Sequence, residues 1–225
     1  MKEVSIGFCG FGGQGIILSA VVLGTAAVTK DGLYAVETQS YGSEARGGQC
    51  QAALIISRSP INSLGGAEKD ILVAMSQAAF DRYVSSLRPG GLLVIDPDMV
   101  TPSRLQGKEV RVMEVPATKT AIRLGNRICA NMVILGFLQG LTGIVSKEGL
   151  TEAVRETVPE RYLDLNLRAI EEGTRLAGSQ APRAEESVGT REVPAPRSEV
   201  QPREDKAGSA AGSVAGSAAR PQRDP

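Results

Sequence analysis

The sequence of 225 residues has no histidine, no tryptophan and only three cysteines. Without histidine, the chain cannot form a Ser-His-Asp triad, a Cys-His dyad or a histidine-ligated metal site. Its cysteines, Cys9, Cys50 and Cys129, are too few for the four thiolates of an ordinary iron–sulfur cluster, and they form no CxxC pair. These absences exclude much common catalytic and redox chemistry for this chain on its own.

The chain also has no net charge, because 25 Lys and Arg residues balance 25 Asp and Glu residues. This balance gives no electrostatic attraction to nucleic acid or to an anionic membrane. The apolar run over residues 16–28 is too short to span a bilayer, and the N-terminus has no signal-peptide pattern. Since unpaired cysteines fit a reducing compartment, we expect a cytoplasmic protein with no membrane and no nucleic-acid partner.

The composition changes sharply after Ala177. Residues 178–225 contain no Leu, Ile, Met, Phe, Tyr or Cys but six of the twelve prolines. Their four valines cannot bury enough apolar surface to offset the entropy lost on ordering. We predict one folded domain over residues 1–177 and a disordered Ala/Gly/Ser/Pro-rich tail over residues 178–225, with a partner-docking peptide as the alternative reading of the tail.

The first 177 residues alternate between β-prone runs and helical patterns. The predicted strands cover residues 4–9, 33–38, 50–57, 70–75, 92–96 and 109–115. The predicted helices cover residues 15–30, 76–87, 117–124, 126–141, 147–157 and 163–176. This alternation predicts an α/β fold, a Rossmann-like sandwich with a mostly parallel sheet, helices on both faces and further helices at the C-terminal end. Because only about eleven polar residues separate the second and third strands, too few for a crossover helix, we expect these two strands to pair antiparallel.

Residues 10–15, GFGGQG, match the pattern GxGxxG between the first predicted strand and the first predicted helix. Glycines allow a tight turn, and the free N–H groups at the helix start favour a phosphate or carboxylate. Glu37, 22 positions after Gly15, is placed where the ribose-binding acid of a dinucleotide site would stand. The pattern leaves three interpretations open: a dinucleotide site, another anion site, or glycines that serve only close helix–sheet packing.

A second loop, residues 39–49 (QSYGSEARGGQ), is polar and rich in glycine. Arg46 could present its guanidinium to a carboxylate or phosphate, and an ion pair with Glu44 that only shapes the loop is an equal alternative. Asn131 stands in an apolar helical run and is predicted to be a buried amide with its hydrogen bonds satisfied.

Six segments of the sequence follow one another in a familiar order. They are GFGGQGIILSAVVLGTAA, TQSYGSEARGG, DILVAMSQAAFDRY, PGGLLVIDPDMV, VPATKTAIRLGNRICANMVILGFL and NLRAIEEG. Through them the sequence resembles the gamma subunits of 2-oxoacid:ferredoxin oxidoreductases, and within that family the 2-oxoglutarate type. The resemblance covers nearly all of residues 3–177 and does not extend to the tail.

The resemblance implies a multi-subunit enzyme that oxidatively decarboxylates a 2-oxoacid to its acyl-CoA and reduces ferredoxin. Such complexes use thiamine diphosphate, Mg, [4Fe-4S] clusters and coenzyme A. The resemblance places the thiamine diphosphate and the clusters in alpha, beta and ferredoxin-like partner subunits. We therefore expect this chain to hold no cofactor or metal by itself, to have no catalytic residue, and to contribute structure and the coenzyme A side of the site.

The resemblance also carries two loops over as a candidate cofactor-binding set. The residues are Gly10, Gly12, Gly13, Gln14 and Gly15 in the first loop, and Tyr41, Glu44, Arg46, Gly47 and Gly48 in the second. We expect both loops to face partner subunits and to frame the entrance for coenzyme A or substrate. Two alternatives stay open: a stand-alone NAD(P)-binding Rossmann oxidoreductase that uses the GxGxxG loop and Glu37, and a regulatory domain that binds a small molecule.

Overall fold

The computed structural model of the chain describes residues 3–41, 48–62, 68–102, 105 and 109–180. Within these residues, short apolar and alternating runs form six strands. Their bounds are β1 Val4–Phe11, β2 Tyr34–Tyr41, β3 Gln49–Ser57, β4 Lys69–Ala74, β5 Leu87–Ile95 and β6 Arg111–Glu114. They make one sheet in the order β2-β3-β1-β4-β5-β6.

The antiparallel pairing expected for β2 and β3 is confirmed. The two strands run in unbroken register from the pair Tyr34–Ser57 to the pair Tyr41–Cys50. β3 is also antiparallel to β1, whereas β1, β4, β5 and β6 are mutually parallel. β3 therefore separates β2 from β1, which distinguishes this sheet from the dinucleotide-binding order, in which these two strands are neighbours.

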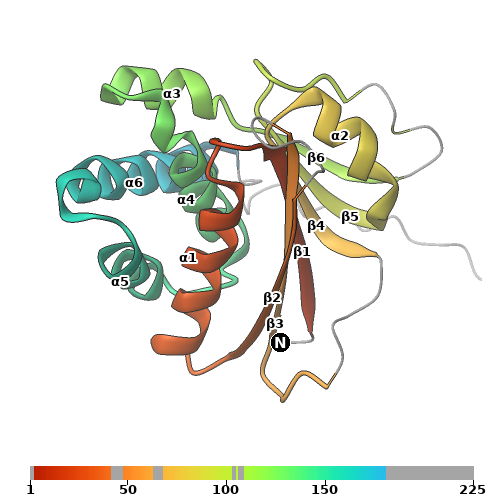
Figure 1. Ribbon diagram of the computed structural model, residues 1–225, viewed down its shortest axis with the longest axis horizontal. Helices are drawn as coiled ribbons and strands as arrows, with labels where there is room; N and C mark the ends of the chain where they lie inside the picture. Colours follow the sequence, from red (N-terminus) through yellow and green to blue (C-terminus); the bar gives the residue numbers. More distant parts are fainter. Residues whose placement is uncertain (1–2, 42–47, 63–67, 103–104, 106–108, 181–225) are drawn as a thin grey trace, which may run out of the picture. The chain divides into compact units, whose positions relative to one another are not determined.

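Helices cover both faces of the sheet, as predicted (Figure 1). Their bounds are α1 Ile16–Thr29, α2 Gln77–Tyr83, α3 Ala117–Leu124, α4 Ala130–Thr142, α5 Lys147–Thr157 and α6 Leu163–Gln180, with 3₁₀ turns at Val84–Ser86, Arg127–Cys129 and Glu160–Tyr162. α1, α4, α5 and α6 lie on one side of the sheet and α2 lies on the other (Figure 1). None of the described helices is long and apolar enough to cross a membrane.

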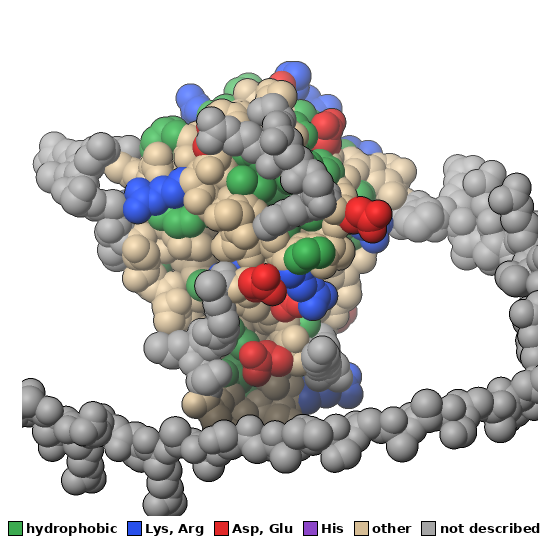
Figure 2. Space-filling model, turned by 90° about the vertical axis from the view of Figure 1, so that its right-hand side faces the viewer, with side chains coloured by type: hydrophobic (Ala, Val, Ile, Leu, Met, Phe, Trp, Pro, Cys, Tyr) green, Lys and Arg blue, Asp and Glu red, His purple; other side chains and the backbone are tan. Residues whose placement is uncertain are grey.

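Two hydrophobic clusters hold these layers together. The larger cluster joins the sheet to α1, α4, α5 and α6 and contains the fully buried side chains of Phe8, Leu23 and Phe137. The smaller cluster lies between the sheet and α2 and is centred on Phe80 and Leu93. On the α2 side, the hydrophobic side chains that reach the surface form small separate patches among other side chains (Figure 2).

The helix expected over residues 76–87 ends early, because α2 stops at Tyr83, a 3₁₀ turn follows and Leu87 already belongs to β5. Two further predicted boundaries are wrong for local reasons. The fifth strand was expected from residue 92, but β5 begins at Leu87, because the Pro-Gly-Gly signal marks a bulge inside the strand instead of a turn. At this bulge Gly90 has a φ of +73° and its N–H donates to Glu109 O. The helix expected over 126–141 is split, because the Asn126 side chain accepts from Ile128 N and caps a 3₁₀ turn ahead of α4.

The boundary between the predicted domain and the predicted tail also shifts slightly. α6 continues to Gln180, three residues past Ala177, and the Gln180 side chain donates to Glu114 O on β6. The remainder of the predicted disordered tail lies outside the described residues.

Candidate functional site

The candidate site lies at the edge of the sheet where the parallel strands have their carboxyl ends. β3 runs in the opposite direction, so its amino end lies at the same edge, uppermost in Figure 1. Both predicted loops start here, and Gly12 N donates to Gly48 O over 3.1 Å. The described ends of the two loops therefore lie at one edge of the sheet.

Part of the second loop lies outside the described residues. Glu44, Arg46 and Gly47 belong to that part, and only the backbone of Tyr41, at the end of β2, is described. The roles predicted for these four residues stay predictions.

The glycine loop has a backbone that other residues would strain. Gly13 and Gly15 have φ values of +94° and +74°, in the left-handed region that favours glycine. A Cβ atom on Gly10 would lie 2.6 Å from Gln14 Oε1 and 2.7 Å from Ile16 Cδ1. A Cβ atom on Gly13 would meet nothing within 4 Å, so this glycine borders open space.

The Gln14 side chain fastens this loop to the sheet with both ends of its amide. Its Oε1 atom accepts a hydrogen bond from Phe11 N at 2.7 Å, and its Nε2 atom donates to Met75 O at 2.8 Å. Met75 directly follows β4. One side chain thus fixes the distance between the end of β1 and the end of β4.

Asn131, on α4, supports the other end of the loop. Its side chain is 2% exposed and donates from Nδ2 to Gly15 O over 3.3 Å, which confirms the predicted satisfied amide. A Cβ atom on Gly15 would lie only 2.5 Å from Asn131 Nδ2. α4 and the glycine loop therefore pack at a distance that only glycine allows.

A cavity of about 440 Å³ opens beside this loop. It is bounded by the glycine loop, the end of β4, the first turn of α3 and the 3₁₀ turn before α4. The lining residues are Gly12, Gly13, Gln14, Met75, Thr118, Asn126, Arg127, Ile128 and Ala130. Three members of the predicted set line it, while Gly10 and Gly15 lie behind them against Gln14 and Asn131.

The cavity has the chemistry of an anion site. Gly13 lines the cavity, and within the described part of the chain no hydrogen bond uses its N–H group, just ahead of the 14-residue helix α1. The positive end of the helix dipole adds to this donor. Arg127 supplies an exposed guanidinium on the opposite wall.

A buried carboxylate lies close to this cavity but is already bonded. Asp96 is 1% exposed and accepts hydrogen bonds from Thr118 N at 2.7 Å and Asp98 N at 3.1 Å. It thereby caps α3 and does not line the cavity. The N-terminus of α3 is therefore already capped, and the free donor comes from the glycine loop.

Most of the opposite wall was not predicted from the sequence alone. Thr118, Asn126, Arg127 and Ile128 were not predicted as site residues, because more than a hundred residues separate them from the glycine loop. A usable signal was present: an asparagine directly after a helix-ending glycine interrupts the helical run, and Gly125 has a φ of +111°.

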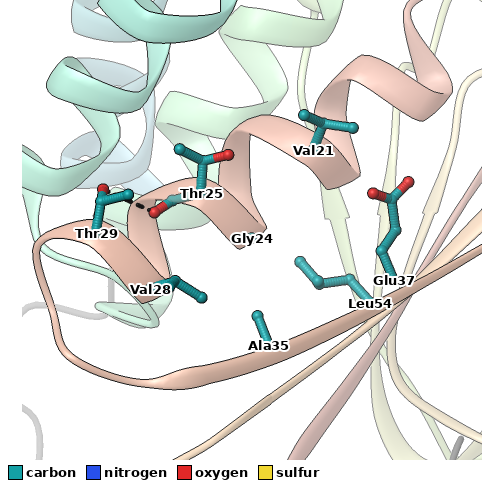
Figure 3. Close-up of a pocket in the computed structure, with 8 residues that line it drawn as sticks. All are labelled: Val21, Gly24, Thr25, Val28, Thr29, Ala35, Glu37 and Leu54. Carbon is teal, nitrogen blue, oxygen red and sulfur yellow. Dashed lines mark hydrogen bonds between the residues drawn. The ribbon is translucent and has the colours of Figure 1, made fainter.

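Glu37 does not reach this cavity. It lies on β2, two strands away from β1, and lines a separate hollow between α1 and β2 (Figure 3). Its pKa is raised, mainly by burial, with a hydrogen bond from Gln39 acting in the opposite direction. The ribose-binding position expected for Glu37 is therefore wrong, because the β2–β3 hairpin moves β2 away from the glycine loop.

The three cysteines are reduced and buried. Burial, with a smaller contribution from Cys50, raises the pKa of the Cys9 thiol to about 12. Across residues 3–180, where described, no cluster of three or more Cys, Asp or Glu side chains could hold a metal ion. The described cysteines have the character of small core residues.

Comparisons with known proteins agree with this fold. The sequence profile of the family "Pyruvate ferredoxin/flavodoxin oxidoreductase" matches residues 5–176. The chain is 47% identical to the 2-oxoglutarate synthase subunit KorC of Methanothermobacter thermautotrophicus, over 78% of this chain and 94% of that protein.

Two solved structures extend the comparison. One is a keto/oxoacid ferredoxin oxidoreductase gamma subunit from Geobacter sulfurreducens, with a TM-score of 0.68 and 38% identity over 78% of this chain and 99% of the other. The second is the 2-oxoglutarate:ferredoxin oxidoreductase of Magnetococcus marinus with 2-oxoglutarate, coenzyme A and succinyl-CoA bound. It has a TM-score of 0.73 and 26% identity over 80% of this chain and 32% of that chain.

Proposed function

The chain belongs to the pyruvate ferredoxin/flavodoxin oxidoreductase family as a gamma-type subunit, and on this basis we propose that its carboxyl-edge cavity binds coenzyme A. In the proposed complex, 2-oxoglutarate is oxidatively decarboxylated to succinyl-CoA while ferredoxin is reduced. The family resemblance read from the sequence is confirmed. The choice of 2-oxoglutarate follows the relatives that act on it.

The observation that carries the proposal is the pairing of the glycine loop with Arg127 across one cavity. Coenzyme A has phosphate groups, which fit N–H donors at a helix start together with one guanidinium. Met75 and Ile128 add apolar surface to the same cavity, against which less polar parts of the ligand can pack. The free N–H group of the glycine loop and Arg127 bind and orient the ligand, and the loop keeps its shape through Gln14 and Asn131.

The decarboxylation and the electron transfer belong to the partner subunits in this proposal. Thiamine diphosphate with Mg would supply the carbanion chemistry and iron–sulfur clusters the electron path, each in another chain. The residues described here do not fit these groups, because the three thiols are buried and no group of three or more Cys, Asp or Glu side chains comes together among them. The partner subunits are the alpha, beta and ferredoxin-like chains expected from the resemblance, and the complex is proposed to work in the cytoplasm.

A stand-alone NAD(P)-dependent oxidoreductase is not supported. Its acid, Glu37, lies outside the cavity, and the relatives are subunits of 2-oxoacid oxidoreductases. The glycine loop is thus a turn that this family shares and not a nicotinamide fingerprint.

Replacing Arg127 tests the proposed coenzyme A site. In the assembled complex, Arg127→Ala should raise the KM for coenzyme A roughly 10- to 100-fold, since a hydrogen bond to a charged group contributes about 1.5–3 kcal/mol. The KM for 2-oxoglutarate should stay unchanged. Steady-state kinetics with ferredoxin as acceptor measure both constants.

A neighbouring arginine provides the matched control. Arg123 is exposed on α3 and bonds to Thr120 without lining the cavity, so Arg123→Ala should leave both constants unchanged. An intact complex in which Arg127→Ala leaves the KM for coenzyme A at the wild-type value would contradict the proposed site.

A further inference from the structure

In the sheet that the described residues form, β2 is an edge strand, and its one protective charge against pairing is the inward-facing Glu37. The strand is eight residues long, contains neither lysine nor proline, and pairs with β3 without a register shift. Isolated proteins usually interrupt such edges with charges, prolines or bulges, because the outer backbone groups would otherwise recruit another strand. The opposite edge strand, β6, has only four residues, two of them charged (Arg111 and Glu114), and is followed closely by Pro116.

An apolar hollow runs beside this edge. Its volume is about 310 Å³, and it lies between β2 and the flank of α1 (Figure 3). Gly24 on α1, Ala35 on β2 and Leu54 line it, and a Cβ atom on Gly24 would lie 3.2 Å from Leu54 Cδ1, so α1 packs closely on the sheet at this point. Val28 on α1 borders the hollow and is 50% exposed. Tyr34 precedes Ala35 on β2, so its side chain lies on the opposite face of the sheet, where it is 48% exposed. Apolar surface therefore flanks β2, the outermost strand of the described sheet, on both faces.

One charged group lines the hollow. The Glu37 side chain rises from β2 beside Leu54, near Val21 (Figure 3). Its half-buried, apolar surroundings disfavour the carboxylate, which is why its pKa is raised. A cation brought to this position would compensate for the lost hydration. The hollow thus favours an occupant with aliphatic side chains and one basic group.

A second copy of this chain fits poorly at this edge. If two β2 strands continued the sheet with their helices on the same side, the pairing would be antiparallel, because a parallel pairing of two identical edges places the helices on opposite sides. In the fully overlapped antiparallel case, the two Glu37 carboxylates lie opposite or diagonal to each other, and like charges in cross-strand positions are destabilising.

We propose that the edge of β2 pairs with a β-strand of a partner subunit, whose alternate aliphatic side chains enter the hollow and whose Lys or Arg faces Glu37. In this mode, backbone hydrogen bonds supply affinity and the side-chain pocket supplies specificity. The inference rests on the proposed function only in requiring a complex with other subunits.

Hydrogen–deuterium exchange on the assembled complex tests the pairing. The outward-facing amides of β2 should exchange about tenfold or more slowly in the complex than in the chain alone. Unchanged β2 exchange in a complex that does form would overturn this inference and leave the proposed function standing. If no complex with 2-oxoacid oxidoreductase subunits forms, the proposed function and this inference both fail. If the β2 amides of the chain alone are already protected, and this protection grows as the chain is concentrated, the strand that pairs with β2 comes from a second copy, and the proposal is overturned.

Side-chain variants test the hollow. Glu37→Lys reverses the charge, and Ala35→Leu fills the space, so each should weaken binding of the purified partner subunits about tenfold or more. Arg111→Glu, a charge reversal on the opposite edge strand, should leave binding unchanged. Melting temperatures verify that the variants fold. If Glu37→Lys does not fold, the milder Glu37→Gln takes its place. Wild-type affinity in a folded Glu37→Lys or Ala35→Leu variant would overturn the proposal.

Discussion

At the residue scale, two glycines of the glycine loop, Gly13 and Gly15, adopt a backbone conformation that other residues rarely take. Gly13 and Gly15 both have positive φ values, but their surroundings differ. Gly13 borders open space, whereas Gly15 touches the Asn131 amide, so a Cβ atom there would also collide. The sequence motif treats the two glycines alike, and only the structure separates their roles.

This difference predicts unequal losses of stability. Gly13→Ala should lower the free energy of unfolding by about 1 kcal/mol, from backbone strain alone. Gly15→Ala adds an overlap with a buried side chain and should cost about 1–3 kcal/mol more. Urea denaturation of the two variants measures the difference. Equal losses would show that Asn131 moves aside and does not fix the loop.

Some of the site could be predicted from the sequence at this scale and some could not. Gly12, Gly13 and Gln14 were predicted, because a strand, a glycine turn and a helix follow one another within a short stretch. Arg127 was not, since its place opposite the loop depends on how α3 and α4 pack across the sheet edge. Local patterns give turns; long-range packing decides which side chains meet.

At the scale of elements, end signals determined which boundaries were correct. Two predicted helices, α3 and α5, have the predicted bounds. α5 begins where the Ser146 side chain accepts from Gly149 N, and α3 ends at Gly125 in the left-handed conformation. β5 and α4 were less well predicted, because the hydrogen bond from Gly90 N to Glu109 O keeps the Pro-Gly-Gly segment inside the strand, and because Asn126 caps a local 3₁₀ turn through Ile128 N.

α4 and α6 illustrate packing that no local pattern reveals. They cross with glycines in contact with the opposite backbone: a Cβ atom on Gly136 would overlap Ile170 O, and one on Gly173 would overlap Val133 O. Since neither backbone can move without its helix, the crossing distance is set by these two glycines. The position of α4, and with it Asn131 and Arg127, follows from this crossing.

Substitution at the crossing should therefore be costly. Gly173→Ala is expected to lower the free energy of unfolding by about 1–3 kcal/mol or more, because the overlap is with backbone atoms. Gly178→Ala, on the same helix but with nothing within 4 Å of the added Cβ atom, should be neutral or stabilise by up to about 1 kcal/mol. Thermal and urea denaturation compare the two. A Gly173→Ala protein as stable as Gly178→Ala would show that the helices separate freely.

At the scale of the whole molecule, the β2–β3 hairpin gives the fold its functional character. It moves β2 away from β1 and removes the acid that a dinucleotide site would need. It leaves the glycine loop free to face the 3₁₀ turn that carries Arg127. It also makes β2 the edge strand of the described sheet, which we propose binds a partner. The position of β3 between β2 and β1 thus explains why the site does not suit a dinucleotide. It also explains the two proposed surfaces, the cavity beside the glycine loop and the edge of β2.

The central claim is that this chain supplies the coenzyme A side of a 2-oxoacid:ferredoxin oxidoreductase. Photo-crosslinking of a photoreactive coenzyme A analogue to the assembled complex, followed by peptide mapping, tests it most directly. We expect label on this chain, in the peptides that contain Gly12–Gln14 and Arg127, and loss of that label with excess coenzyme A. Displaceable label found only on the other subunits would contradict the account.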